Sequence, residues 1–120
     1  MSVFDDQAAF MLACGQTIEK YNPDQAVMYS DLVDEEHQEW LDARTNAETA
    51  DAVIDLIVVL IGYGLSKGWP MQKLWDEVHR SNMAKIDPAT GKVLRRHDGK
   101  VMKPEGWSPP DLASILDEEG

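Results

Sequence analysis

Apolar residues recur at helical spacing through the first 85 positions, so the sequence predicts a chain built mainly from helices. The first predicted helix covers about 4 to 20 and ends at Tyr21-Asn22-Pro23, a sequence that stops a helix well. Three more helices are predicted over about 24 to 44, about 47 to 66, and from Pro70 to about Met83 or Lys85. Either Thr45 or Asn46 can cap the third of them.

The third predicted helix is apolar on nearly every side, with an uninterrupted apolar run from Leu56 to Ile61. Such a helix needs neighbours all round, which indicates a helical bundle or a dimer interface. The apolar segment from Val53 to Leu65 is shorter than a bilayer and contains Asp55, so the sequence predicts a buried helix and no membrane span.

The pattern changes after Lys85. Two turn signals, 87–92 and 97–100, flank short, partly alternating runs, which favours a small hairpin or an ordered loop. A short closing helix is predicted over about 111 to 116. The expected fold is therefore all-α: a four- to five-helix bundle protomer with a C-terminal loop or hairpin extension. We expect a single domain over 1–120, with a helical part at about 4–85 and an extended arm at about 86–120.

Acidic residues outnumber basic ones, 22 to 11, and the formal net charge is -11. This balance disfavours a nonspecific nucleic-acid binder, whose affinity needs a basic face. A single cysteine, Cys14, excludes an intrachain disulfide and a cysteine-based zinc site, and fits a reducing cytoplasm. Cys14 is expected to be a small buried residue. The acidic start has no basic region typical of a signal peptide, so a cytoplasmic location is expected.

Carboxylates occupy positions where a helical core is expected. On the second predicted helix Glu35, Glu36 and Glu39 continue the apolar stripe through Met28 and Leu32. On the third, Asp51 and Asp55 are one turn apart. Two carboxylates ~4 Å apart repel by roughly 4 kcal/mol even at an effective dielectric near 20, so they must take up protons or a cation. Ligands that are all oxygen suit a hard divalent ion, Mg²⁺ or alternatively Mn²⁺.

Four ordered segments carry a family resemblance. Glu35-Glu36-His37-Gln38-Glu39 is similar to the EExxE motif of the all-α MazG-like nucleoside triphosphate pyrophosphohydrolases, a superfamily that includes dimeric dUTPases and phosphoribosyl-ATP pyrophosphohydrolases. The segments 78–85 (VHRSNMAK), 98–103 (DGKVMK) and 109–112 (PPDL) resemble those of a phosphoribosyl-ATP pyrophosphohydrolase-like subgroup. The similarity covers about 10 to 116. The motif's other half, ExxD, fits either Glu48 with Asp51 or a register ending at Asp55 in which Ala52 replaces the usual Glu.

The resemblance implies a homodimer or homotetramer that hydrolyses the α-β phosphoanhydride of a nucleoside triphosphate, releasing pyrophosphate. It implies metal ligands Glu36, Glu39, Asp51 and Asp55, with Glu35 and Glu36 as catalytic residues. Glu35 would be a further ligand or the group that deprotonates water. House-cleaning of noncanonical nucleotides, dUTP hydrolysis and a phosphoribosyl-ATP step all fit this set.

Lysines within so acidic a chain are the natural phosphate contacts. Asn82 and Lys85 stand three apart near the end of the fourth predicted helix, while Lys100 and Lys103 lie in the arm. We therefore expect these four residues to bind substrate. Trp107, in a proline-flanked segment, is either a packing residue or a platform for a base. The rival to the enzyme is a noncatalytic acidic helical dimer that acts as an interaction or regulatory protein, and binding of a divalent ion distinguishes the two.

Overall fold

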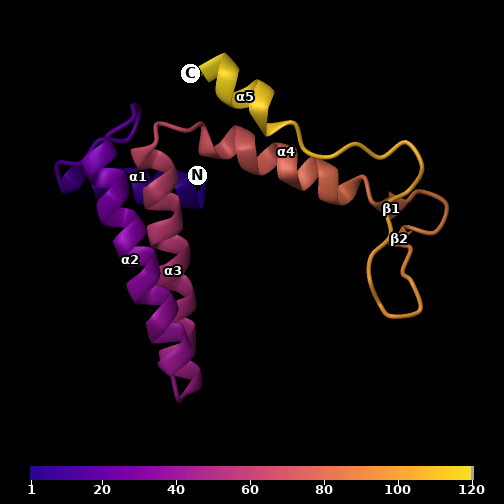
Figure 1. Cartoon of the computed structure of the whole chain (residues 1–120), viewed down its shortest axis with the longest axis horizontal. Helices are drawn as coiled ribbons and strands as arrows, with labels where there is room; N and C mark the ends of the chain where they lie inside the picture. The colour runs from indigo at the N-terminus through magenta and orange to yellow at the C-terminus, as the bar shows by residue number, and fades with distance from the viewer. Residues whose placement is uncertain (120) are drawn as a thin grey trace. The chain divides into compact units, whose positions relative to one another are not determined.

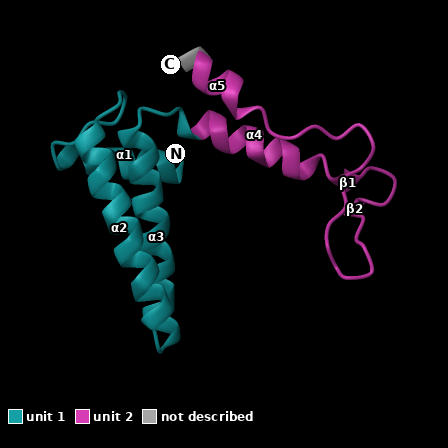
Figure 2. Ribbon diagram, in the orientation of Figure 1, with its two compact units in different colours: residues 1–71 teal, residues 72–120 magenta. Residues whose placement is uncertain are grey.

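The computed structural model describes residues 1–119, which form five helices and one pair of short antiparallel strands (Figure 1). The chain divides into two compact units, Met1–Met71 and Gln72–Gly120 (Figure 2). The predicted all-α fold class is confirmed. The elements are α1 (Val3–Ala13), α2 (Pro23–Asp42), α3 (Asn46–Ser66), α4 (Met71–Met83), β1 (Ile86–Asp87), β2 (Lys92–Val93) and α5 (Leu112–Glu119).

Unit 1 is built around a long antiparallel hairpin of α2 and α3 (Figure 1). Asn22 caps α2 by accepting a hydrogen bond from the backbone N of Gln25, and Pro23 stands in the first turn, where its missing N–H costs nothing. Thr45 caps α3 by accepting one from the backbone N of Glu48. These caps fix where the two helices begin and leave only a tight connection between them.

The first helix is shorter than its apolar spacing predicts, and the predicted end near Lys20 is wrong. Gly15 adopts a φ of 77°, a left-handed conformation that ends α1 at Ala13. The backbone N of Gly15 donates to the Leu12 carbonyl and that of Gln16 to the Met11 carbonyl, which is a Schellman ending. Cys14 is exposed at this ending rather than buried as expected.

The core of unit 1 gathers side chains from all three of its helices. The buried apolar cluster comprises Met11, Tyr29, Val59, Ile61 and Leu65. Gly62 of α3 lies against the Tyr29 ring, where a Cβ atom would overlap it, so this glycine permits the close approach of α2 and α3. The Tyr29 hydroxyl donates a hydrogen bond to the Gln16 side chain, which satisfies the polar end of this buried ring.

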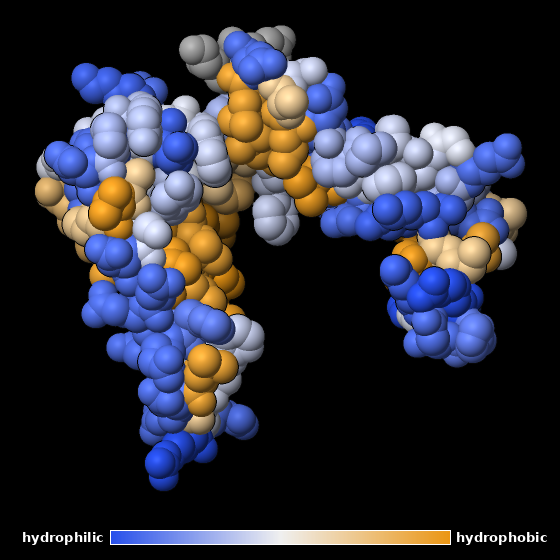
Figure 3. All heavy atoms as spheres, viewed as in Figure 1, coloured by the Kyte–Doolittle hydropathy of each residue, from blue (hydrophilic) through white to orange (hydrophobic). Residues whose placement is uncertain are grey.

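Helix α3 is apolar on two faces, of which only one is buried within the chain. Val53, Ile54, Ile57 and Leu60 are exposed, and the view in Figure 3 is hydrophobic along α3 and hydrophilic along α2. At 21 residues α3 is long and apolar enough to cross a membrane by length and composition alone. The core helix of a soluble protein passes the same test, and the expectation of a buried helix without a membrane span stays a prediction.

Unit 2 folds back on its own helix. β1 pairs with β2 across the turn at 88–91, and a second turn is closed by an isolated bridge between Arg95 and Val101. The chain then returns to α4: the Trp107 indole donates to the Ser81 carbonyl, and the Asp111 backbone N donates to the Glu77 carboxylate. Both predicted turns are present, and hydrogen bonds tie the arm to α4 at Ser81, Arg80 and Glu77.

Candidate metal centre

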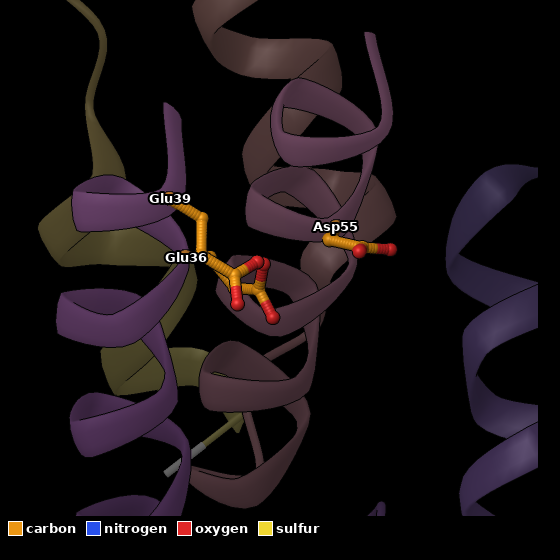
Figure 4. Close-up of side chains that lie close together, drawn as sticks. All are labelled: Glu36, Glu39 and Asp55. Carbon is orange, nitrogen blue, oxygen red and sulfur yellow. The ribbon is translucent and has the colours of Figure 1, made fainter. Parts of the chain in front are cut away.

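The α2–α3 hairpin brings together three carboxylates. Glu36 and Glu39 stand one turn apart on α2, and Asp55 comes from α3 (Figure 4). Each contributes a carboxylate oxygen, and these three oxygens all lie within 4.8 Å of one another. The antiparallel packing of α2 against α3 thus places acids from both helices at the same level.

The electrostatics of this group centre on Glu36. Its pKa is raised to about 7, first because burial disfavours the charged form and then because of a side-chain hydrogen bond with Glu39. The negative charges of Glu39, Asp55 and Asp51 raise it further. The protein alone therefore keeps one proton in the group at a pH where isolated carboxyls have lost theirs.

One oxygen of the group lacks any partner. Glu36 Oε2 is buried and accepts no hydrogen bond from the residues at 1–119. An unsatisfied buried acceptor is costly, and a cation beside it removes that cost. Because all the donors are carboxylate oxygens, the set fits a hard divalent ion of the Mg²⁺ or Mn²⁺ type.

A cavity of about 250 Å³ continues the acidic surface beyond Glu39. It is lined by Glu39, Asp42, Ala43, Glu48, Asp51 and Ala52, from the facing ends of α2 and α3. Asp42 was not among the predicted site residues. Its position three residues after Glu39 on the same helix was the available signal, because residues three apart share a helix face.

The other acids predicted for the site, Asp51, Glu35 and Glu48, are not members of the group formed by Glu36, Glu39 and Asp55. Asp51 is exposed one turn before Asp55 and is near enough to act on the pKa of Glu36. Glu35 is exposed on α2. Glu48 stands in the first turn of α3, where its carboxylate accepts a hydrogen bond from the Arg44 backbone N at 3.2 Å. Of the two sequence registers, the one that ends at Asp55 places its acid in the group.

All four predicted substrate contacts lie in unit 2, and contacts link three of them to one another or to Trp107. The Lys85 ammonium donates to Asn82 Oδ1 at 3.1 Å, and the Lys85 and Lys103 ammoniums both lie against the Trp107 ring. Lys100 is exposed, and its backbone forms hydrogen bonds with Asp98 and Arg96. In the sequence, the Trp107 ring was a candidate platform for a base. Its contacts with the two lysines could not be predicted, because no sequence pattern signals them.

Comparison with known proteins identifies a family. The family model for phosphoribosyl-ATP pyrophosphohydrolase matches residues 9–82, which is more than half of the chain. The match contains all three carboxylates of the group, and it also contains Asn82. No curated protein matches the chain. The family resemblance expected from the sequence is confirmed.

Proposed function

This chain belongs to the phosphoribosyl-ATP pyrophosphohydrolase family, within the MazG-like superfamily, and from that membership we propose that it hydrolyses a nucleoside triphosphate at the α-β phosphoanhydride. The products are a nucleoside monophosphate and pyrophosphate. Pyrophosphohydrolase activity on a nucleotide is what the family supports. The observation that carries the proposal is the group formed by Glu36, Glu39 and Asp55, with its unpartnered buried oxygen.

We propose that Glu36, Glu39 and Asp55 hold a divalent ion, Mg²⁺ or Mn²⁺, with Asp51 as a further ligand. Members of this superfamily generally use divalent metals, and the chemistry of the donor set favours a hard ion. When bound, such an ion neutralises charge on the phosphate oxygens and lowers the pKa of water. The three carboxylates would hold this ion at the α2–α3 hairpin, where its positive charge would attract the phosphate chain.

Proton transfer is the role proposed for the acids of α2. Glu35 is exposed, and its carboxylate is free to accept the proton of the attacking water as the oxygen–phosphorus bond forms. The bond from the α phosphorus to the bridging oxygen then breaks, and pyrophosphate leaves. Glu36, whose pKa is about 7, holds or releases a proton near neutral pH and is the second catalytic candidate.

In unit 2, Asn82, Lys85, Lys100 and Lys103 are proposed to bind the substrate. A lysine ammonium offers three donors and a full charge to phosphate oxygens. Because the chain carries a net charge of -11, binding of a triphosphate depends on such local positive groups. Lys85→Ala is expected to raise the Michaelis constant for a triphosphate.

The proposed substrates are noncanonical nucleoside triphosphates or dUTP, in a house-cleaning role in the cytoplasm. The same carboxylates also suit phosphoribosyl-ATP, so the base and sugar must be read elsewhere. A panel of canonical and modified triphosphates, assayed for pyrophosphate release with Mg²⁺ and with Mn²⁺, identifies the substrate. Preference for one base or sugar is expected to appear as a difference in kcat/KM.

Glu36→Gln and Asp55→Asn test the proposed function directly. Each removes one charge from the group while keeping the side-chain volume, so turnover is expected to fall by about 100-fold or more. The matched control is Asp34→Asn, which removes the same charge from an exposed position on the same helix. Full ion-dependent turnover in either variant would refute the assignment. An unmodified protein that neither binds the ion nor hydrolyses any of the panel would instead be the noncatalytic acidic protein.

We also propose that the protein is a homodimer or homotetramer. The exposed apolar face of α3 (Val53, Ile54, Ile57 and Leu60) is contiguous in helical spacing, since these positions recur at three- and four-residue intervals. A contiguous apolar patch on a protein surface is typical of a binding surface. A second copy of the chain presents the same face, which allows a symmetric interface.

A further inference from the structure

We propose that Trp107 is a positioning residue that holds Lys103 beside Lys85, so that the two ammoniums together bind the phosphate chain of an anionic ligand. This inference rests on the proposed function for the identity of the ligand. It concerns residues of unit 2 alone, and it gives Trp107 a role other than stacking on a base.

The indole is fixed on the last turn of α4. Trp107 Nε1 donates to the Ser81 carbonyl at 2.6 Å, and the backbone N of Trp107 donates to the Pro104 carbonyl at 3.1 Å. Ser81 is itself held, because it is only 2% exposed and its hydroxyl donates to the Val78 carbonyl. The ring therefore has a defined place on the helix that carries Asn82 and leads to Lys85.

Two cations lie against this one ring. Lys103 Nζ is 4.6 Å from the ring centroid and Lys85 Nζ is 5.5 Å from it, distances at which an aromatic ring attracts an ammonium. Lys85 comes from the end of α4 and Lys103 from the arm. The attraction of each to the ring offsets part of their mutual repulsion, so the ring gathers two charges that would otherwise move apart.

These two lysines keep their charge available. Within the described part of the chain neither forms an ion pair, whereas Arg80 is paired with Glu77 and Arg96 with Asp98. Lys85 does donate to Asn82, but an amide oxygen leaves its charge uncompensated. Two uncompensated ammoniums that lie against one ring, in a chain of net charge -11, form a local site for a polyanion. A chain of linked phosphates fits it better than one carboxylate, because it offers an oxyanion to each lysine.

The test is calorimetric binding of inorganic tripolyphosphate to the metal-free protein at low salt. Wild type, Trp107→Leu, Lys103→Met and the double variant are compared, with Lys92→Met as the control. Lys92 is an exposed lysine of β2, and its loss removes the same charge elsewhere in unit 2. Trp107→Leu is expected to weaken binding about tenfold, while Lys92→Met changes it little.

A positioning role makes a specific prediction for the double variant. If Trp107 acts in part through Lys103, adding Trp107→Leu to Lys103→Met gives a smaller further loss than Trp107→Leu gives alone, whereas independent contributions would multiply. Trp107→Phe keeps an aromatic ring and is expected to bind tripolyphosphate more tightly than Trp107→Leu does. With a triphosphate substrate, Trp107→Leu raises KM and leaves kcat unchanged.

Three results overturn the inference: no tripolyphosphate binding by the wild type, equal binding by Trp107→Leu, or multiplied losses in the double variant. Melting curves of all variants show whether the protein still folds. If Trp107→Leu unfolds, Trp107→Met, which also lacks the ring, replaces it in the cycle, and undiminished binding by that variant again overturns the inference. Failure of the proposed function is separate, since it appears as absent turnover with tripolyphosphate binding intact.

Discussion

At the scale of single residues, Glu36 is the side chain whose environment departs most from that of a surface acid. Burial and neighbouring acids raise its pKa to about 7, and its buried Oε2 has no hydrogen-bond partner within 1–119. A proton and a cation are alternative ways to relieve the same unfavourable charge. They therefore compete for one group.

This competition predicts that ion affinity depends on pH. Below about 7 the ion must displace the proton of Glu36, so the affinity for Mn²⁺ should rise by up to about tenfold per pH unit and level off above it. Titration calorimetry between pH 5.5 and 8 measures this. Glu36→Gln should lower the affinity and flatten the profile, and Asp34→Asn should do neither. A profile in the wild type that is already flat across pH 7 would contradict the proposed ligand.

The sequence predicted the acids of the group, and it erred on their orientation. Glu35, Glu36 and Glu39 all continue a stripe in the sequence, yet only Glu36 is half-buried, while Glu35 and Glu39 are exposed. Adjacent positions on a helix differ by about 100°, so Glu35 and Glu36 cannot share one narrow face. Which of them turns inward depends on the rotation of α2 against α3, and a single-helix pattern does not contain that rotation.

At the scale of elements, α2 and α3 pack closely because Gly62 has no side chain. A methyl group there would overlap the Tyr29 ring, which is buried and held by its hydrogen bond to Gln16. The register of the hairpin, and with it the level at which Asp55 faces Glu36, depends on this contact.

Gly62→Ala is therefore expected to destabilise the protein. Overpacking a rigid site costs about 1–3 kcal/mol, and the helical preference of alanine returns at most about 1 kcal/mol. The matched control is Gly64→Ala, whose methyl group meets only the flexible end of Met71 and should cost less. Urea unfolding of both variants gives the two free energies. Equal stability of the two would show that the Tyr29 contact does not limit the packing.

The exposed face of α3 gives a prediction at the same scale. Ile57→Asp places a charge within an apolar stripe that we propose a second copy covers, so it should shift the protein towards monomer. Light scattering behind size exclusion measures the mass. The control is Leu12→Asp, an equally drastic change at an exposed apolar residue of α1. A wild type that is already monomeric at micromolar concentration would refute the proposed oligomer.

Element boundaries were predictable wherever the sequence carries a cap or a proline. The starts of α2, α3 and α4 lie within two residues of their predicted positions, since Pro23, Thr45 and Pro70 mark them. The end of α1 was missed because apolar spacing continues to Ile18 although Gly15 ends the helix. The return of the arm to α4 was not predictable, since it depends on tertiary hydrogen bonds from Trp107 and Asp111.

At the scale of the whole molecule, the two kinds of proposed ligand group belong to different units. The carboxylates Glu36, Glu39 and Asp55 lie in unit 1, and Asn82, Lys85 and Lys103 lie in unit 2. The compact units divide after Met71, so unit 2 contains most of α4 together with the arm. Each unit has internal contacts of its own that hold its group.

A fragment of residues 1–71 should therefore remain helical and bind Mn²⁺. Its apolar cluster and the three carboxylates are all contained within it. Binding of tripolyphosphate should be lost, because the lysines around Trp107 are absent. Circular dichroism and calorimetry on the fragment and on the full chain provide the comparison. A folded fragment without affinity for Mn²⁺ would contradict the metal centre, and one that retained phosphate binding would contradict the role of unit 2.

The hydrogen bonds between the arm and α4 have a consequence for how such a protein can diversify. The hydrogen bond between Trp107 and Ser81 closes a loop over 82–106. The one between Asp111 and Glu77 fixes the chain after this loop to the same helix. This loop can be lengthened, shortened or altered in sequence at small entropic cost, since doubling the length of a closed loop costs only about 0.6 kcal/mol. The family match ends at residue 82, just where this loop begins. Changes in this segment can therefore alter ligand preference while the carboxylate-bearing hairpin stays as it is.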